Sequence, residues 1–271
     1  VPQLLRRFDL RPKKSLGQNF LVDEAALARV AAAAELAPAD SVLEIGPGLG
    51  SLTRHLVEAA GRVVAVELDQ SLLPALLFVL EPYANVTVLH GDILKLAPSA
   101  LALEPSYKVV ANIPYYITSA VIRRLLEGSP KPALVVLTVQ REVAERLCAG
   151  PGEMSLLAVS VQVYSRPQIV ARVPAGAFYP RPEVDSAVVR LEVLPAPAVA
   201  GMEMDQFFQV VKAGFSQRRK QLRNALAGGL QLAPAAVEAA LARAGVAPQR
   251  RAETLGLAEW EAVARGLAPL R

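Results

Sequence analysis

The sequence predicts an α/β fold, namely a Rossmann-like parallel sheet followed by a small all-helical C-terminal domain. Three observations support this. Short apolar runs alternate with amphipathic segments from residue 23 to residue 139, and a glycine-rich turn at 46–50 follows the first run. After residue 197 the remaining periodic segments are all helical. Alternation of this kind indicates a sheet with helices on both faces.

The elements are expected in strict order. Helices are predicted over 23–36, from 51, and over 70–80 and 119–127, and strands over 42–45, 63–67, 86–90, 108–111 and 133–139. Segments 159–164, 168–173 and 184–193 are predicted as later strands, the last antiparallel because its apolar and polar residues alternate. Two prolines make 194–197 a linker. Helices over 205–214, 218–227, 234–244 and 257–266 follow, so we expect domains at 1–195 and 196–271.

The composition narrows the classes of function. With 53% apolar and 20% charged residues, the chain can form one large core or two smaller ones. Its apolar runs are shorter than a membrane span, and its first residues lack the pattern of a signal peptide, so we expect a cytoplasmic protein without membrane segments. One cysteine and two histidines exclude a cysteine-based metal cluster and disfavour a Ser-His-Asp triad. No metal is expected.

The net charge of +4 is unevenly distributed. Residues 1–20 carry +4, residues 21–204 carry −5 and residues 205–271 carry +5. Basic ends around an acidic middle indicate a polyanion held by the termini, with nucleic acid as the candidate. Residues 1–16 form a basic arm, for which we hypothesise disorder until RNA or cofactor binds.

The first strand and its turn predict a pocket for a nucleoside cofactor. Three glycines at alternate positions follow strand 42–45, and Glu67 ends the next strand. Glycines permit close backbone approach, a helix from Ser51 directs its N-terminal amides at the site, and the acid suits a ribose. The G-x-G-x-G spacing, with Glu44 two residues before it, suits S-adenosylmethionine better than a nicotinamide. A strand, turn and helix without cofactor is the alternative.

Asn112-Ile113-Pro114-Tyr115 follows strand 108–111 and therefore lies at the carboxyl end of the sheet, where such folds hold ligands. The exocyclic amine of adenine is a poor nucleophile because its lone pair is delocalised into the ring. The Asn112 side-chain oxygen and the Ile113 carbonyl could accept its two N–H groups, and Tyr115 could stack on the base. The alternative is a turn in which Asn112 caps the next helix.

Three further motifs complete the candidate site. Asp92 follows another strand and could accept a hydrogen bond from the cofactor's adenine amine. Phe178 lies in a loop with two prolines, where it could stack on an extruded base. Arg218, Arg219, Lys220 and Arg223 share a segment with apolar residues and could bind phosphates. A plain turn, a proline-rich connector and a solvated basic face are the respective alternatives.

Taken together, the motifs resemble the ribosomal RNA adenine N6,N6-dimethyltransferase family of the small-subunit (KsgA/RsmA) type. The resemblance lies in 14–21, the glycine turn, Glu67, 91–94, 112–115, 178–186 and 218–220. It implies a class I methyltransferase that moves methyl groups from S-adenosylmethionine to N6 of two adjacent adenosines in the 3′-terminal hairpin of small-subunit (16S) rRNA. The partner would be the small ribosomal subunit, the role would be in ribosome biogenesis, and we expect a monomer.

The resemblance also implies roles for matching positions. Asn19 and Leu21 would contact the methionine end of the cofactor, Gly46 its loop, Glu67 its ribose and Asp92 its adenine. Asn112 would contact the cofactor and, with Tyr115, present the target amine, and Phe178 would stack on the target base. Ile113 and Tyr116 depart from the usual family residues. Because both line the region that must accommodate a monomethylated amine, the number of methyl groups added stays open.

Three alternatives remain at the level of sequence. A large-subunit rRNA adenine methyltransferase of the macrolide-resistance type would share the cofactor and the catalytic motifs. A ribosome-assembly factor could act mainly by binding. A DNA adenine methyltransferase would use a similar Asn-x-Pro-Tyr turn, and both polymers offer phosphates to basic ends.

Overall fold

The computed structural model describes residues 1–101, 103, 105–217 and 219–268. It divides into two compact units. The first unit comprises Val1–Ala144 and Arg166–Val193, and the second comprises Glu145–Ser165 and the chain from Leu194 onward. The expected boundary after residue 195 lies two residues beyond Val193, but residues 145–165, which we expected in the first domain, group with the second unit.

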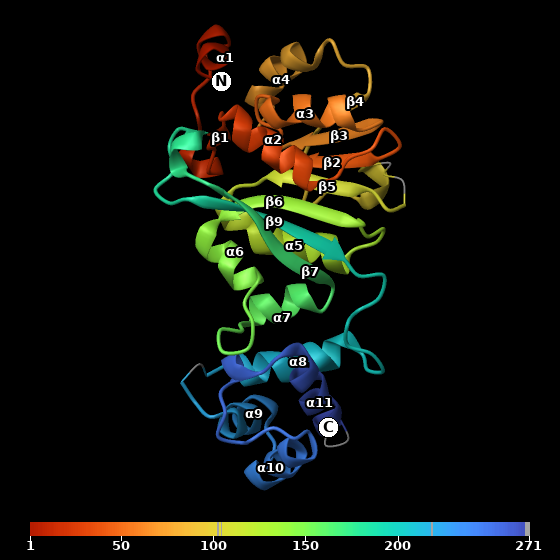
Figure 1. The fold of residues 1–271 in the computed structure, drawn as a ribbon, viewed down its shortest axis with the longest axis vertical. Helices are drawn as coiled ribbons and strands as arrows, with labels where there is room; N and C mark the ends of the chain where they lie inside the picture. Colours follow the sequence, from red (N-terminus) through yellow and green to blue (C-terminus); the bar gives the residue numbers. More distant parts are fainter. Residues whose placement is uncertain (102, 104, 218, 269–271) are drawn as a thin grey trace. The chain divides into compact units, whose positions relative to one another are not determined.

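The main sheet has seven strands in the order β4-β3-β2-β5-β6-β9-β7 (Figure 1). Their bounds are β2 (Ser41–Ile45), β3 (Arg62–Glu67), β4 (Val86–His90), β5 (Lys108–Asn112), β6 (Leu134–Gln140), β7 (Ser165–Val173) and β9 (Ser186–Val193). Strands β2 to β6 pair in parallel, whereas β9 pairs antiparallel with β6. The predicted Rossmann-like α/β fold, including its antiparallel strand, is confirmed.

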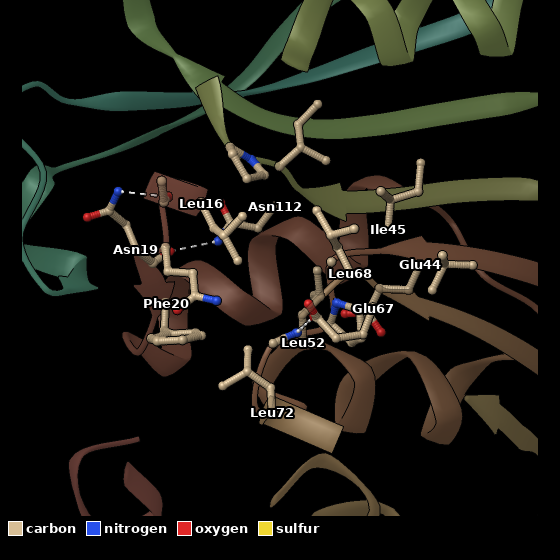
Figure 2. Close-up of a pocket in the computed structure, with 18 of the residues that line it drawn as sticks. Leu16, Asn19, Phe20, Glu44, Ile45, Leu52, Glu67, Leu68, Leu72 and Asn112 are labelled. Carbon is tan, nitrogen blue, oxygen red and sulfur yellow. Dashed lines mark hydrogen bonds between the residues drawn. The ribbon is translucent and has the colours of Figure 1, made fainter. Parts of the chain in front are cut away.

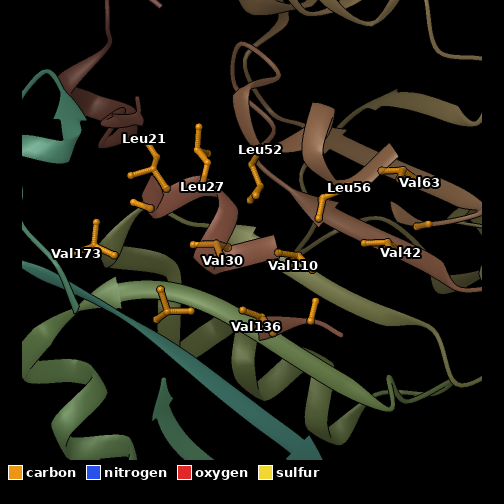
Figure 3. Close-up of a cluster of buried hydrophobic side chains, with 14 of the residues drawn as sticks. Leu21, Leu27, Val30, Val42, Leu52, Leu56, Val63, Val110, Val136 and Val173 are labelled. Carbon is orange, nitrogen blue, oxygen red and sulfur yellow. The ribbon is translucent and has the colours of Figure 1, made fainter. Parts of the chain in front are cut away.

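Alternate residues of the central strands face opposite sides of the sheet, and both sets are buried. Val42, Val63, Val110 and Val136 pack in one cluster with helices α2 (Glu24–Ala33) and α3 (Ser51–Ala59) (Figure 3). Their neighbours Leu43, Val64, Val109 and Val135 are at most 1% exposed. Strands buried on both faces have continuous apolar sequences, which explains the apolar runs in this part of the chain.

Besides these elements, residues 1–147 and 178–179 contain further α-helices and two strands of two residues each. They are α1 (Pro2–Arg7), β1 (Phe20–Leu21), α4 (Leu73–Leu80), α5 (Thr118–Glu127), α6 (Arg141–Leu147) and β8 (Phe178–Tyr179). Strands β1 and β8 pair antiparallel in a separate two-stranded sheet, with Leu21 opposite Phe178. This pairing joins two segments that are far apart in the sequence, and it lies beside the pocket described below.

Two expectations about local structure are wrong. The N-terminal arm, expected to be disordered because of its basic charge, is folded. Its helix α1 has an apolar face, and Leu5 on that face is buried in a cluster with Phe20 and Leu49. Segment 159–164 is not a strand but falls largely in α7 (Leu156–Gln162). Valine-rich sequence favours strands, but Ser155 caps this helix by accepting a hydrogen bond from the Ala158 amide at 3.1 Å.

The second unit is helical in its described part. Besides α7 it contains α8 (Met204–Phe215), α9 (Leu222–Leu230), α10 (Pro234–Arg243) and α11 (Leu257–Leu267). Trp260 and Phe207 are fully buried, and the Trp260 ring lies 5.3 Å from that of Phe215. Within the described residues, no helix has the length and apolar character needed to cross a membrane.

Candidate active site

A pocket opens in the first unit where strands β2, β3, β4 and β5 end (Figure 2). Parallel strands place their carboxyl ends at one edge of a sheet, so the loops that follow them meet there. Seven residues expected in the site line this pocket: Asn19, Leu21, Gly46, Glu67, Asp92, Asn112 and Phe178. The fold therefore brings together cofactor and catalytic candidates that the sequence spreads over 160 residues.

The glycine turn after β2 has backbone angles that residues with a side chain adopt only with strain. Gly46 and Gly48 have φ values of +71° and +60°. A Cβ added to Gly48 would also lie 3.0 Å from the ring of Phe20. Glycine at 48 thus serves two purposes, since it allows the left-handed turn and lets β1 close against the loop.

Glu67 ends β3 inside the pocket and is 5% exposed. Its Oε2 accepts a hydrogen bond from the Gly48 amide at 3.0 Å, and its Oε1 accepts one from the Asp69 amide at 2.7 Å. These bonds fix the carboxyl group while leaving lone pairs for a ligand. Burial raises the pKa of Glu67, although both amides donate to it.

Glu44 favoured S-adenosylmethionine in the sequence but was not among the residues expected to contact it, and it lines the pocket. It is 1% exposed, and burial raises the pKa of its carboxyl to about 8. Its Oε2 has no hydrogen-bond partner among the described residues. A buried acceptor left unpaired is costly, so its place in a pocket wall points to a donor on the ligand. The sequence feature that could have indicated a contact with the ligand is an acidic residue within an otherwise largely apolar strand.

Asn112 ends β5 and is oriented by the N-terminal segment. Its Nδ2 donates to the backbone carbonyl of Asn19 at 3.2 Å, as a dashed line in Figure 2 shows. Asn19 is held in turn, because its own Nδ2 donates to the Gly17 carbonyl at 3.2 Å. With its nitrogen used in this bond, the amide oxygen of Asn112 is the atom of this side chain that can accept a further hydrogen bond.

Phe178 lines the pocket from β8, where it is paired with Leu21 of β1. It is 4% exposed and belongs to the buried cluster that contains Leu21 and Leu27. Neighbours on several sides therefore hold its ring.

Asp92 lines the pocket after β4, and its Oδ1 accepts a hydrogen bond from the Leu94 amide at 2.9 Å.

The other candidates lie elsewhere or outside the described residues. Arg219, Lys220 and Arg223 belong to the second unit, so they do not line the pocket. Arg219 and Lys220 are exposed, while Arg223 forms an ion pair with Glu238. Arg218 lies outside the described residues. The backbone of Tyr115 begins a short 3₁₀ turn, and its side chain is also outside the described part.

The pocket lining fits S-adenosylmethionine better than a phosphate-bearing cofactor. It contains the carboxyl groups of Glu44, Glu67 and Asp92, and its described lining includes no lysine, arginine or histidine. A positively charged sulfonium or ammonium group would favour the ionised form of these carboxyl groups, and their oxygens match ribose hydroxyls and an adenine amine. A phosphate would find no cation there. Nor do the described residues hold a cluster of three or more groups suited to a metal ion.

Comparisons with known proteins agree with this site. The family model described as ribosomal RNA adenine dimethylase matches residues 10–268. A protein named ribosomal RNA small subunit methyltransferase A from Dehalococcoides mccartyi is 48% identical over 96% of this chain and 89% of its own length. One of the same name from Pelotomaculum thermopropionicum is 48% identical over 97% of this chain and 94% of its own.

Two solved structures share the whole fold. The 23S rRNA methyltransferase ErmE is 31% identical with a TM-score of 0.76, over 92% of this chain and 99% of its own. A dimethyladenosine transferase from Plasmodium falciparum is 24% identical with a TM-score of 0.79, over 92% and 98%. The match of nearly the full chain to one family model, with the site residues gathered in one pocket, leads to one assignment. The chain belongs to the ribosomal RNA adenine dimethylase family.

Proposed function

We propose that this S-adenosylmethionine-dependent rRNA adenine dimethyltransferase methylates N6 of two adjacent adenosines in the 3′-terminal hairpin of small-subunit (16S) rRNA. The observation that carries the proposal is that Asn112 lines the same pocket as Glu44, Glu67 and Asp92, with its side-chain nitrogen bonded to the Asn19 carbonyl. The near full-length relatives, both named for the small subunit, support that substrate over the large-subunit alternative. ErmE, named for 23S rRNA, is similar over 92% of this chain at lower identity.

The bound cofactor supplies an electrophilic methyl group. Glu67 would hold its ribose and Asp92 its adenine, and Gly46 and Leu21 would pack against it. Asn112 and the Ile113 carbonyl would accept both N–H groups of the target amine, which draws the nitrogen lone pair out of the ring. Because the amine becomes a strong acid once methylated, it can release its proton to water without a dedicated base.

The target adenine must leave its stack to reach the pocket. We assign Tyr115 and Phe178 to stacking on the extruded base, Phe178 being held by its pairing with Leu21. The basic residues Arg218, Arg219, Lys220 and Arg223 of the second unit would bind rRNA phosphates. Arg223 starts from an ion pair with Glu238, so its contribution should be smaller than that of exposed Arg219 or Lys220.

We propose a monomer as the working form. We propose that it acts in the cytoplasm, where ribosomal subunits are assembled, and that methylation is part of small-subunit biogenesis. The alternative of an assembly factor that acts mainly by binding has a direct test in the variants below.

The decisive assay is transfer of labelled methyl from S-adenosylmethionine to unmethylated small subunits, with large subunits and duplex DNA in parallel. Nucleoside analysis should find dimethyladenosine only in small-subunit RNA. Asn112→Ala should abolish transfer but keep subunit association, whereas Arg219→Glu with Lys220→Glu should weaken association. Transfer to large subunits or DNA instead, or normal transfer by Asn112→Ala, would contradict the proposal.

A further inference from the structure

Residues 13–21, here called the N-terminal clasp, touch the loops on several sides of the pocket. The Asn19 carbonyl accepts from Asn112, and Phe20 packs against Gly48 closely enough to exclude a Cβ there. Gly17, at a φ of +61°, lies against Pro114, since a Cβ built on it would be 3.2 Å from the Pro114 Cβ. The clasp thus spans from the glycine turn to the catalytic tetrapeptide.

Asp69 joins the clasp to the loop after β3. Its Oδ1 accepts from Lys13 Nζ at 2.6 Å, and its Oδ2 accepts from Gln18 Nε2 at 2.8 Å. Lys13 and Gln18 are also bonded to each other, because the Lys13 amide donates to Gln18 Oε1 at 2.8 Å. Lys13 Nζ further reaches Ser71 Oγ at 3.0 Å. Two points of the clasp are therefore held by one carboxylate.

The backbone of Asp69 performs a second task, because its amide donates to Glu67 Oε1 at 2.7 Å. Asp69 consequently contacts the clasp through its side chain and the ribose-binding candidate through its main chain. A displacement of the clasp acts on Asp69, and a displacement of Asp69 acts on Glu67. The hydrogen bonds to the clasp and to Glu67 therefore meet at this one residue.

The connection is electrostatically strong on the Asp69 side. The Asp69 side chain is 3% exposed and that of Lys13 44%. Burial alone would raise the pKa of Asp69, but hydrogen bonds from Lys13, Ser71 and Gln18 outweigh it and lower the pKa to about 2. A buried carboxylate with several donors is ordered, whereas one that loses its donors is penalised by desolvation.

We propose that Asp69 is a positioning residue for cofactor binding, which sets the clasp, and with it Asn19, at a fixed distance from Glu67. Because the ligand in question is S-adenosylmethionine, the inference rests on the proposed function. Asp69 is not among the residues that line the pocket, so it acts through Glu67 and the clasp. Its loss should raise the Kd and KM for cofactor more than it lowers kcat.

The test measures S-adenosylmethionine binding by calorimetry, without RNA, for four variants of the full chain. Asp69→Asn replaces one carboxylate oxygen by an N–H group, which would face Lys13 or Gln18, both of them donors. It should weaken binding roughly tenfold or more. Lys13→Gln should weaken it less, because Gln18 and Ser71 still serve the carboxylate. Lys13→Arg keeps the positive charge and should therefore retain most of the wild-type affinity. Arg11→Gln removes a charge of the same sign at an exposed residue outside the clasp and should bind as wild type.

Trypsin provides a readout of the clasp itself. Arg11 precedes Pro12, so the sensitive bonds in this region follow Lys13 and Lys14. Asp69→Asn should be cut there faster than wild type, and saturating cofactor should slow the cut in wild type more than in the variant. Equal cofactor Kd values for wild type and Asp69→Asn would overturn the inference, even if the variant melted earlier. Failure of the wild type itself to bind S-adenosylmethionine would instead overturn the proposed function.

Discussion

The side-chain amide of Asn112 donates a hydrogen bond to the backbone carbonyl of Asn19, 3.2 Å away and 93 residues earlier in the chain. This contact connects the first recognisable motif of the sequence with the tetrapeptide expected to carry the chemistry. It orients the Asn112 amide, because the nitrogen is bonded to the protein, and under the proposed function the oxygen is the acceptor for the target amine. Several consequences can be measured.

Asn112→Asp should lower kcat by roughly a hundredfold or more, since it replaces the donor by a carboxylate oxygen that faces the Asn19 carbonyl. Single-turnover methyl transfer to small subunits measures this. Asn85→Asp is the matched control: its amide also donates to carbonyls, those of Val57 and Ala60 at 2.8 and 2.9 Å, but it does not line the pocket. That control should lose thermal stability and keep its kcat. An unchanged kcat in Asn112→Asp would refute the orientation argument.

Gly48→Ala should weaken S-adenosylmethionine binding and lower the melting temperature. The added Cβ meets both a left-handed φ of +60° and the Phe20 ring at 3.0 Å, and the left-handed backbone alone costs about 1–2 kcal/mol. The Gly48 amide also helps hold Glu67. Gly150→Ala, with no atom within 4 Å of the new Cβ and no positive φ, should change neither quantity. Equal behaviour of the two variants would show that the turn tolerates a side chain.

Sequence patterns were sufficient for the sheet and for much of the pocket, and the reason is geometric. Parallel strands buried on both faces must be apolar runs, and their carboxyl ends must share one edge. Gly46, Glu67 and Asn112 each follow or end such a run, and Asp92 follows the parallel edge strand β4, so their convergence could be predicted. The roles assigned to them individually stay predictions.

Contacts between distant short segments could not be predicted. Strands β1 and β8 have two residues each, which is too short to show a periodic pattern. The pairing of Leu21 with Phe178 joins two segments that are far apart in the sequence. The bond from Lys13 to Asp69 is similarly invisible, because one lysine among several basic residues looks like part of a solvated arm. Local charge counting therefore predicted disorder where tertiary packing produces a helix.

Glu44 should make the stability of the cofactor-free protein depend on pH. Its pKa is about 8 in the folded chain against an ordinary value of 4.5, so the folded state binds its proton more tightly. The resulting stability is fully present below pH 4.5 and is lost as the pH rises through 8. Relative to wild type, Glu44→Gln should gain stability steadily from pH 5 to pH 8.5. Melting curves across that range test this, and a parallel course of the two proteins would exclude an elevated pKa.

Gly214 and Gly228 should respond oppositely to alanine, although both lie inside helices of the second unit. A Cβ on Gly214 would come 2.4 Å from Cη2 of the fully buried Trp260, so Gly214→Ala should destabilise the unit by about 1–3 kcal/mol through overpacking.

The nearest atom to a Cβ on exposed Gly228 is Gln217 Nε2 at 3.7 Å, so Gly228→Ala should instead stabilise by about 0.5–1 kcal/mol through helix propensity. Trp260 is the only tryptophan in the chain, and its fluorescence during denaturant unfolding reports on this unit. Cofactor affinity should stay at the wild-type value in both variants, because every described residue that lines the pocket belongs to the first unit. Stabilisation by both alanines would mean that α8 does not pack on Trp260 as closely as the helices described above require.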